Sequence, residues 1–438
     1  MQEKGNVIFV WKDYKSRTAG LSKKKINTTK RMMSSRTITY KLPKEVLSLV
    51  EEPQIRLFEE DFGGITKKDF IGIKYNHRSY NVNSQLEMIS ESKISAISLF
   101  SGAGGLDIGT QLAGIKVISS LDFDRDSVAT MKANRYFHDT VHLHKNIKDV
   151  SGNDYKTIII NNNPDKLILV GGPPCQPFSK AGYWRTHENR LGADDPRNMI
   201  GNYLRLISEV KPNGFILENV ESILHPKNVH AVDDLVLAIE KLGYNHKICK
   251  VNAIEFGIPQ KRKRVFIVAS KKQFKTELLK THGSNKEILL NPILKPYERV
   301  IDWIGKYDNI IYSDDYDSTE GKYFEDLMAV PPGSNYIALT ERKGYSNPKF
   351  IAGKRYWTFL LKLHPLQPSW TIISSPGHWE GPFHWNSRRL RMKEIAAIQT
   401  FPEDYHFVGS RRSIHKQIGN AVPPLLGKKI IEYLTENI

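Results

Sequence analysis

The feature that most constrains the fold is an alternation of short apolar segments and helical segments between Lys93 and Lys271. Each apolar segment has the length of a buried strand, and the helical segments repeat their apolar residues every three to four positions. Strands that alternate with helices in this way build a parallel sheet that is covered on both faces. The sequence therefore predicts an α/β domain with a doubly wound, mostly parallel sheet. Strands are expected at 96–100, 117–122, 167–170, 214–217 and 265–268, and helices at 126–134, 199–210 and 232–242.

The alternation stops after residue 270. The stretch from 271 to 382 is richer in Tyr, Trp, Pro and Gly and has no regular period, which predicts a smaller, irregular domain. Helical patterns return at 389–399 and 425–434.

The amino-terminal part has a different composition. Its first 44 residues carry twelve Lys or Arg and two acidic residues, which predicts a flexible basic arm at 12–35. An alternating segment at 36–42, a short helix at 44–51 and a strand at 69–75 suggest a small module that ends near residue 90.

The charge and the cysteines limit the class of protein. The formal net charge is +17, which indicates a polyanionic partner or, alternatively, an ordinary basic surface. Two cysteines exclude a disulfide framework and a four-cysteine zinc site. No segment has the length and apolar character of a membrane span, and no signal peptide pattern begins the chain, so a soluble cytoplasmic protein is expected.

A glycine-rich turn follows the first expected strand, in AISLFSGAGGLDIG at 96–109. Such a turn between a strand and a helix lets the backbone approach a nucleotide-like ligand, although small residues there can also serve packing alone. Asp122 ends the next strand, where a carboxylate can accept hydrogen bonds from ribose hydroxyls. At this point a nicotinamide cofactor remains open.

The segment LILVGGPPCQPFS at 167–179 brings a cysteine to the end of another strand. Pro173 and Pro174 restrict the backbone directly before Cys175 and hold it at the carboxyl edge of the sheet. A thiol in a proline-rich turn is an unusual core residue, so we interpret Cys175 as reactive. Cys249 has no such setting and is interpreted as an inert, buried thiol.

Charged residues follow two further strands. In GFILENVESI, Glu218 comes after four nonpolar residues and is expected at the same sheet edge as Cys175, where it can handle a proton or form a salt bridge. In FGIPQKRKRVFIV, alternation predicts that Gln260, Arg262 and Arg264 share one face, either as a clamp for carbonyls and phosphates or as an ordinary basic strand.

Together these segments form an ordered set: FSGAGGLDIG, GGPPCQPFS, ENV, QKRKR, RRLRMKEIAAIQTFP and QIGNAVPP. The chain from Phe100 onward resembles the cytosine carbon-5 DNA methyltransferase family, of the bacterial restriction–modification type. The resemblance implies a Rossmann-like catalytic domain and S-adenosylmethionine as methyl donor. It implies that Cys175 adds to carbon 6 of a flipped-out cytosine, that Glu218 holds or protonates ring nitrogen 3, and that Arg264, with Arg262, orients the base.

The resemblance also suggests which residues bind the cofactor. Asp122 stands where the family more often has Glu, and Asn146 stands where it usually has Asp; both keep a hydrogen-bond acceptor. The implied cofactor residues are Phe100, Gly102, Gly104, Asp122, Phe123, Asn146, Ile147 and Asn420.

Double-stranded DNA is the partner that the resemblance implies. A mobile loop at 179–197 is expected to close over the flipped base, and the irregular domain is expected to recognise the target sequence. Thr371 stands where the family keeps a Thr before an aliphatic residue. The candidate DNA contacts are Lys180, Arg185, Arg190, Arg197 and Thr371.

The implied organisation has five parts: a basic arm and possible small module at 1–93, the catalytic domain at 94–270, the target-recognition domain at 271–385, a hinge at 386–412 and a return to the catalytic domain at 413–438. The expected enzyme needs no metal and no oligomer, and it pairs genetically with a restriction endonuclease.

Two alternatives have the same motifs. A tRNA cytosine-5 methyltransferase usually carries a Cys-Phe-Thr signature, and neither cysteine here precedes a Phe. A noncatalytic DNA-binding homologue should lose the nucleophile, the Glu or the Arg pair, and this chain has all of them. A nicotinamide-dependent oxidoreductase explains only the glycine-rich turn and is rejected.

Overall fold

The computed structural model of this chain describes residues 5–6, 74–79, 93–174, 199–308, 319–353 and 356–438. Contacts divide the chain into two units. The larger unit contains 79–304, 366–377 and 391–438, and the smaller one contains 1–78, 305–365 and 378–390. Each unit is described by itself.

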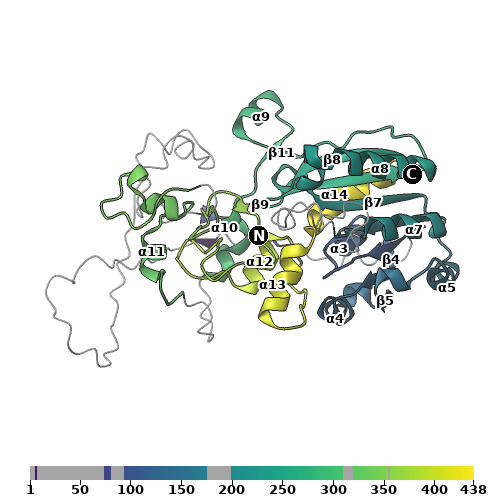
Figure 1. Cartoon of the computed structure of the whole chain (residues 1–438), viewed down its shortest axis with the longest axis horizontal. Helices are drawn as coiled ribbons and strands as arrows, with labels where there is room; N and C mark the ends of the chain where they lie inside the picture. The colour runs from purple at the N-terminus through teal and green to yellow at the C-terminus, as the bar shows by residue number, and fades with distance from the viewer. Residues whose placement is uncertain (1–4, 7–73, 80–92, 175–198, 309–318, 354–355) are drawn as a thin grey trace. The chain divides into compact units, whose positions relative to one another are not determined.

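The larger unit is built on a seven-stranded sheet with the order β5-β4-β3-β6-β7-β10-β8 (Figure 1). The neighbouring strands from β5 to β7 run parallel, and β10 runs antiparallel to both β7 and β8. The predicted α/β class and the mostly parallel sheet are confirmed. The strands are β3 (Ile94–Leu99), β4 (Lys116–Asp122), β5 (Val141–His144), β6 (Lys166–Gly171), β7 (Gly214–Val220), β8 (Asn245–Asn252) and β10 (Lys263–Ser270).

Two strands of this sheet, β5 and β8, were not predicted. They are its two edge strands, and both carry polar residues where a central strand would be apolar: β5 has the sequence VHLH and β8 has NHKICKVN. An edge strand is partly exposed to water, so it lacks the continuous apolar run by which the central strands are recognised.

Helices cover both faces of the sheet. One face packs against α3 (Gly105–Leu112) and α14 (Pro424–Thr435), through Leu106 and Ile430 among others. The other face packs against α5 (Asn153–Asn162), α7 (Ile200–Val210) and α8 (Val229–Lys241). Successive strand residues such as Phe215 and Ile216 contribute to opposite faces, as the pleat requires.

The contact between α3 and α14 depends on a glycine. A Cβ built on Gly109 would lie 2.7 Å from the carbonyl oxygen of Pro424 and 2.7 Å from the amide nitrogen of Lys428. The backbones of the two helices therefore approach more closely than any side chain at residue 109 would allow. This contact joins the carboxyl-terminal helix to the start of the sheet.

The remaining elements of the larger unit are short. They are α4 (Arg125–Ala133), α9 (Asn285–Leu290), α10 (Val300–Ile304), α12 (Met392–Ile398), α13 (Arg411–Asn420), and the pairs β9 (Gln260–Lys261) with β13 (Ser369–Trp370) and β11 (His282–Gly283) with β12 (Lys295–Pro296). The helices predicted at 389–399 and 425–434 correspond to α12 and α14, with shifts of a few residues at their ends.

The smaller unit has little regular structure among its described residues. Its α11 (Phe324–Ala329) packs in an apolar cluster with Tyr336, Leu360 and Phe383. A buried carboxylate, Asp308, accepts hydrogen bonds from Asn386 and Arg388 and so joins two distant segments of this unit.

The division by contacts differs from the boundaries drawn from the sequence. Residues 271–304 and 366–377, which the sequence assigns to the target-recognition domain, have their contacts within the larger unit. The amino-terminal segments at 12–35, 36–42 and 44–51 lie outside the described residues. Of the strand predicted at 69–75, the described part is β2 (Lys74–Tyr75), which pairs with β1 (Gly5–Asn6). None of the helices in the described ranges is long and apolar enough to cross a membrane.

Candidate active site

The site is built where three neighbouring parallel strands end. Leu99 at the end of β3 pairs with Gly171 at the end of β6, and Gly171 pairs with Leu217 in β7. The residues that follow these pairs, Phe100, Gly172 and Glu218, are therefore brought to the same carboxyl edge. This is the edge at which open α/β sheets bind their ligands.

The segment that leads to Cys175 lies directly beside Glu218. A Cβ built on Gly172 would lie 2.8 Å from Oε2 of Glu218, so only glycine fits without movement of the carboxylate. The side-chain amide of Asn219 donates a hydrogen bond to the carbonyl of Pro173 at 3.3 Å. Cys175 itself lies outside the described residues. Glu218 and Asn219, which contact the segment directly before Cys175, are neighbours in β7.

Glu218 is paired with Arg264. Nε of Arg264 lies 2.8 Å from Oε1 of Glu218, and the two side chains are 14% and 13% exposed. The sequence places Glu218 after its strand, whereas β7 continues to Val220 because it pairs with Arg264 of β10. Glu218 and Arg264 thus stand diagonally across adjacent antiparallel strands, on the same face of the sheet. Their ion pair is largely shielded from solvent. Arg264 contacts Oε1 of Glu218, and Oε2 lies beside Gly172.

Arg262 has a different environment from the one expected. Its side chain is completely buried, and it donates hydrogen bonds to the carbonyls of Ile372 at 3.3 Å, Gly419 at 2.9 Å and Ala421 at 3.0 Å. Burial, and secondarily the positive charge of Arg264, lower the pKa of Arg262. Its Nη1 and Nη2 atoms donate to backbone oxygens, whereas its buried Nε has no hydrogen-bond partner among the described residues. The guanidinium connects two segments that the chain brings in from far downstream.

Gln260 contributes to the same connection. Its side-chain carbonyl accepts a hydrogen bond from the amide of Ile372 at 3.0 Å, and its amide donates to Gln399 at 2.8 Å. Of the three alternating residues, Gln260 and Arg262 therefore hold the backbone at Ile372, and Arg264 binds Glu218.

The glycine-rich turn lies at the ends of β3 and β4. Phe100, Gly102 and Gly104 all have left-handed backbone conformations, with φ of 55°, 54° and 76°. Asp122 fixes the turn, because its carboxylate accepts hydrogen bonds from the amide of Gly102 at 2.7 Å and from that of Asp124 at 2.8 Å. Burial raises the pKa of Asp122, and these two bonds oppose that effect.

The turn leaves room for a ligand at one glycine and none at another. A Cβ built on Gly102 would meet no atom of the described residues within 4 Å, whereas one built on Gly104 would overlap Sδ of Met131. Gly104 is thus required for packing, and the open space at Gly102 is where a ligand can approach the backbone.

Comparison with known proteins identifies the family of this chain. The model of the C-5 cytosine-specific DNA methylase family matches residues 94–436. The chain belongs to this family. It is 33% identical over 371 residues to the Type II methyltransferase M.SacI of Streptomyces achromogenes, covering 79% of this chain and 94% of that protein. It is 30% identical over 363 residues to the Type II methyltransferase M.NgoFVII of Neisseria gonorrhoeae, covering 82% and 90%.

Solved structures of similar fold support the architecture. A protein encoded within an E. coli prophage has a TM-score of 0.54 and 23% identity, covering 78% of this chain and 99% of that chain. The Dnmt2 methyltransferase of S. pombe has a TM-score of 0.51 and 16% identity, covering 78% and 98%. The family and the enzyme class predicted from the motifs, a DNA (cytosine-5) methyltransferase, are confirmed.

The structure describes the environment of four further residues that the family resemblance assigns to the cofactor. Phe123 follows Asp122, and its side chain is 74% exposed, so its ring is free to cover a ligand. The side-chain oxygen of Asn146 accepts a hydrogen bond from the amide of Lys148 at 3.1 Å. Ile147, by contrast, is buried in the core, so its side chain does not face an open site. Asn420, the last residue of α13, is exposed, and its carbonyl accepts a hydrogen bond from Arg262 at 3.4 Å.

The expected DNA contacts are mostly outside the described residues. This applies to Lys180, Arg185, Arg190 and Arg197. Thr371 is described: it is half-buried, lies in the larger unit, and donates its hydroxyl hydrogen to the carbonyl of Lys261 at 2.6 Å. The ring of its neighbour Trp370 makes a cation–π contact with Lys261, whose Nζ lies 4.5 Å from the ring centre. Thr371 thus holds the QKRKR segment and stays a predicted DNA contact.

Two residues of this edge were missed by the sequence analysis. Tyr405 is buried and donates its hydroxyl hydrogen to the carbonyl of Ala103 at 2.7 Å, which supports the glycine-rich turn from behind. Asp107, in the motif FSGAGGLDIG, is fully buried in the first turn of α3. The sequence shows that Asp107 lies close to the glycines of the motif, but it does not show that the side chain is buried.

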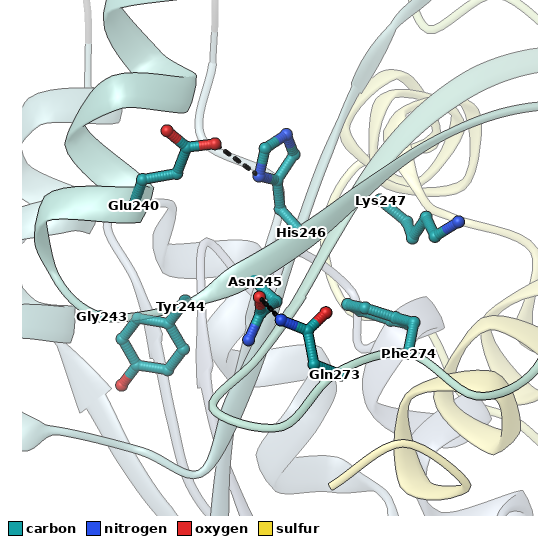
Figure 2. Close-up of a pocket in the computed structure, with 8 residues that line it drawn as sticks. All are labelled: Glu240, Gly243, Tyr244, Asn245, His246, Lys247, Gln273 and Phe274. Atoms are coloured by element: carbon teal, nitrogen blue, oxygen red, sulfur yellow. Dashed lines mark hydrogen bonds and ion pairs between the residues drawn. The ribbon is translucent and has the colours of Figure 1, made fainter.

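A separate hollow of about 530 Å³ lies at the opposite edge of the sheet (Figure 2). It is lined by residues around Asn245, which pairs with Ser270 at the far end of β10 from Arg264. Figure 2 shows Glu240 turned toward His246, at 3.7 Å, and Gln273 donating to Asn245 at 2.7 Å. This hollow is polar and distant along the strands from Glu218, so it is not the candidate active site.

Proposed function

We propose that this protein transfers a methyl group from S-adenosylmethionine to carbon 5 of a cytosine in a specific sequence of double-stranded DNA. The observation that carries the proposal is the shielded Glu218–Arg264 pair, which lies directly beside the glycine before the Pro-Pro-Cys segment. A carboxylate and a guanidinium beside a thiol are the groups that activation of a pyrimidine ring requires.

The proposed chemistry begins with Cys175. Carbon 5 of cytosine is a poor nucleophile, and addition of the Cys175 thiolate to carbon 6 converts it into an enamine-like carbon. Carbon 5 can then take the methyl group that bound S-adenosylmethionine would supply as an electrophile. Loss of the proton from carbon 5 returns its electron pair to the ring and expels the Cys175 thiolate. The base is methylated and the thiolate is restored.

Glu218 and Arg264 act on the other side of the ring in this proposal. Glu218 holds ring nitrogen 3 through the carboxylate oxygen that Arg264 does not occupy, and a proton on that nitrogen withdraws electrons as the thiolate adds. Arg264 fixes the carboxylate and orients the carbonyl of the base. We infer that Arg262 is a positioning residue, since its Nη1 and Nη2 atoms donate to the carbonyls of Ile372, Gly419 and Ala421.

The glycine-rich turn fits S-adenosylmethionine. Gly102 offers backbone with open space above it, Asp122 offers a carboxylate at the end of β4, and Phe123 offers an exposed ring. With Phe100, Asn146 and Asn420, these residues would hold the cofactor, which supplies an electrophilic methyl group when it is bound.

The DNA partner requires base flipping, because carbon 5 and carbon 6 are hidden in the stacked duplex. Extrusion costs a few kcal/mol, which Lys180, Arg185, Arg190 and Arg197 would offset by contacts to phosphates. We propose that the basic amino-terminal arm adds nonspecific affinity for DNA, and that the smaller unit supplies most of the sequence recognition.

Relatives such as M.SacI are named Type II methyltransferases, and we propose that this protein likewise modifies DNA alongside a cognate restriction endonuclease. Co-expression tests this pairing. A neighbouring endonuclease gene should be toxic to a host without the methyltransferase and tolerated with it, and a host that survives the endonuclease alone would contradict the pairing.

Bisulfite or enzymatic methylation sequencing of plasmid DNA tests the main proposal. Cells that express the protein should carry 5-methylcytosine at one short sequence, and cells that express Cys175→Ser should not. Unmodified DNA from cells in which the folded protein binds S-adenosylmethionine would contradict the DNA substrate. Methylated tRNA in the same cells would then favour the RNA alternative.

A further inference from the structure

A buried carboxyl group without a compensating charge lies beneath the glycine-rich turn. Asp107 is the third residue of α3, which begins directly after Gly104, and its side chain has no exposed surface. Within the described part of the chain, neither of its carboxylate oxygens accepts a hydrogen bond of normal geometry. Buried ionisable groups are nearly always paired, so this exception calls for an explanation.

Among the residues that the structure describes, no cation acts on Asp107. From β3, the hydroxyl of Ser98 faces it, and Ser98 also accepts a hydrogen bond from Ser101 of the turn at 2.9 Å. From β4, the nearby charge is another carboxylate, Asp122. From the segment after α12 comes the buried phenol of Tyr405. Burial is the main cause that raises the pKa of Asp107 to about 7, Ser98 opposes it, and Asp122 adds to it.

Charges at the glycine-rich turn reach Asp107. Asp122 binds the amide of Gly102 in the turn and at the same time acts on the Asp107 carboxyl. A positive charge held at Gly102 would therefore act on Asp107 too, with the opposite sign. Because the interior has a low dielectric constant, this interaction is stronger there than it would be in water.

We propose that Asp107 is the buried counter-charge for the positive charge on the methionine part of S-adenosylmethionine. This inference rests on the proposed function, because it assigns a role within the same cofactor site. Asp107 is a positioning residue in this account, since its oxygens are covered and act through space and through the Ser98–Ser101 pair.

Binding of a cation next to Asp107 should release a proton from its carboxyl group. Without a cation nearby, the Asp107 carboxyl shares its population between the neutral and the charged form near neutral pH. A cationic ligand favours the carboxylate, and the proton leaves to solvent. Binding should therefore release roughly half a proton per site at pH 7, and less well above or well below it.

Titration calorimetry of the full chain with S-adenosylmethionine tests this, in buffers of different ionisation enthalpy across the neutral range. Asp107→Asn should bind about tenfold more weakly at pH 7.5 and should lose the proton release that the wild type adds to the ligand's own titration. Asp154→Asn is the matched control, because Asp154 also lies in the first turn of a helix, α5, but is partly exposed and far along the chain from the turn. It should leave both quantities unchanged.

Two further ligands separate the two positive charges of the cofactor. S-adenosylhomocysteine keeps the ammonium and lacks the sulfonium charge, and methylthioadenosine lacks both. If the ammonium is the partner, Asp107→Asn weakens binding of S-adenosylmethionine and S-adenosylhomocysteine equally and leaves binding of methylthioadenosine unchanged. If the sulfonium is the partner, it weakens binding of S-adenosylmethionine only. Equal loss for all three ligands would overturn the proposal.

A second variant retains the carboxyl group and covers the case in which Asp107→Asn does not fold. Ser98→Ala removes the hydroxyl that lowers the pKa of Asp107, so the pH of maximum proton release should rise. An unchanged proton release in both variants would refute the role of Asp107. Failure of the wild type to bind S-adenosylmethionine at all would instead refute the proposed function.

Discussion

Two regions of the same sheet edge differ in how the charges of their carboxylates are compensated. At the ends of β6, β7 and β10, Glu218 is paired with Arg264 at 2.8 Å. At the ends of β3 and β4, the described residues hold Asp122 by backbone amides, and none of them supplies a compensating charge to Asp107. The first region is electrostatically complete before any ligand binds. The second lacks one positive charge, and a cationic cofactor would supply it.

The largest expected effect comes from breaking the complete region. Glu218→Gln keeps the shape of the side chain but removes its titratable carboxyl group, so the side chain can no longer supply a proton to nitrogen 3. We expect the rate of methyl transfer in a single turnover to fall by roughly 10²–10⁴-fold.

Glu221→Gln is the control for that experiment. Glu221 is close to Glu218 in sequence, but it lies near Lys250 and Lys263 at the surface, and it should keep the wild-type rate. Equal losses in the two variants would mean that Glu218 has no special role.

A smaller effect is expected in stability when the buried arginine next to this region is removed. Arg262→Met leaves the carbonyls of Ile372 and Gly419 without the donor that Arg262 supplies, which should lower the free energy of unfolding by on the order of 3 kcal/mol. Urea denaturation measures this loss. Lys263→Met changes an exposed side chain next to it and should change stability by less than about 0.5 kcal/mol. Similar values for the two variants would contradict the positioning role of Arg262.

The incomplete region should respond to pH. The pKa of Asp107 is raised to about 7 in the folded protein, from 3.8, so the folded state binds the proton more tightly than the unfolded state. Its contribution to stability is present at low pH and is lost as the pH rises toward 7. Asp107→Asn removes this loss, so the variant should gain on the order of 2 kcal/mol relative to the wild type between about pH 5 and pH 7, without cofactor.

Thermal or urea unfolding of both proteins at several pH values measures this difference. A difference in stability that stays constant with pH would show that the carboxyl group is not protonated in the fold. Added S-adenosylmethionine should reduce the difference, because it supplies the missing charge.

The smallest effect distinguishes backbone strain from ligand contact. Gly102 and Gly114 both have positive φ, and a Cβ on either meets no atom within 4 Å. Alanine at each should cost about 1 kcal/mol of stability for the left-handed backbone. Only Gly102→Ala should also weaken binding of S-adenosylmethionine in calorimetry. Equal affinities in the two variants would remove Gly102 from the cofactor site.

Part of the site could be predicted because it is encoded in contiguous motifs. The strand–turn–helix pattern at 96–109 and the strand before Glu218 depend on local polarity, and the sheet order brings their ends together at one edge. The extension of β7 to Val220 was missed, because it is set by pairing with β10 rather than by the residues of β7 themselves. The edge strands β5 and β8 were missed for a related reason: their polar residues are stabilised by a neighbour on one side only.

The sequence by itself determined the α/β class, the central strands and the family, because periodicity and motifs are local properties. Only the tertiary structure decided which polar side chains are buried. Arg262 contacts carbonyls more than a hundred residues away along the chain, and Asp107 is buried with no hydrogen-bond partner among the described residues. A residue's type and its neighbours in sequence do not specify these environments, since burial and electrostatics depend on segments that folding brings together.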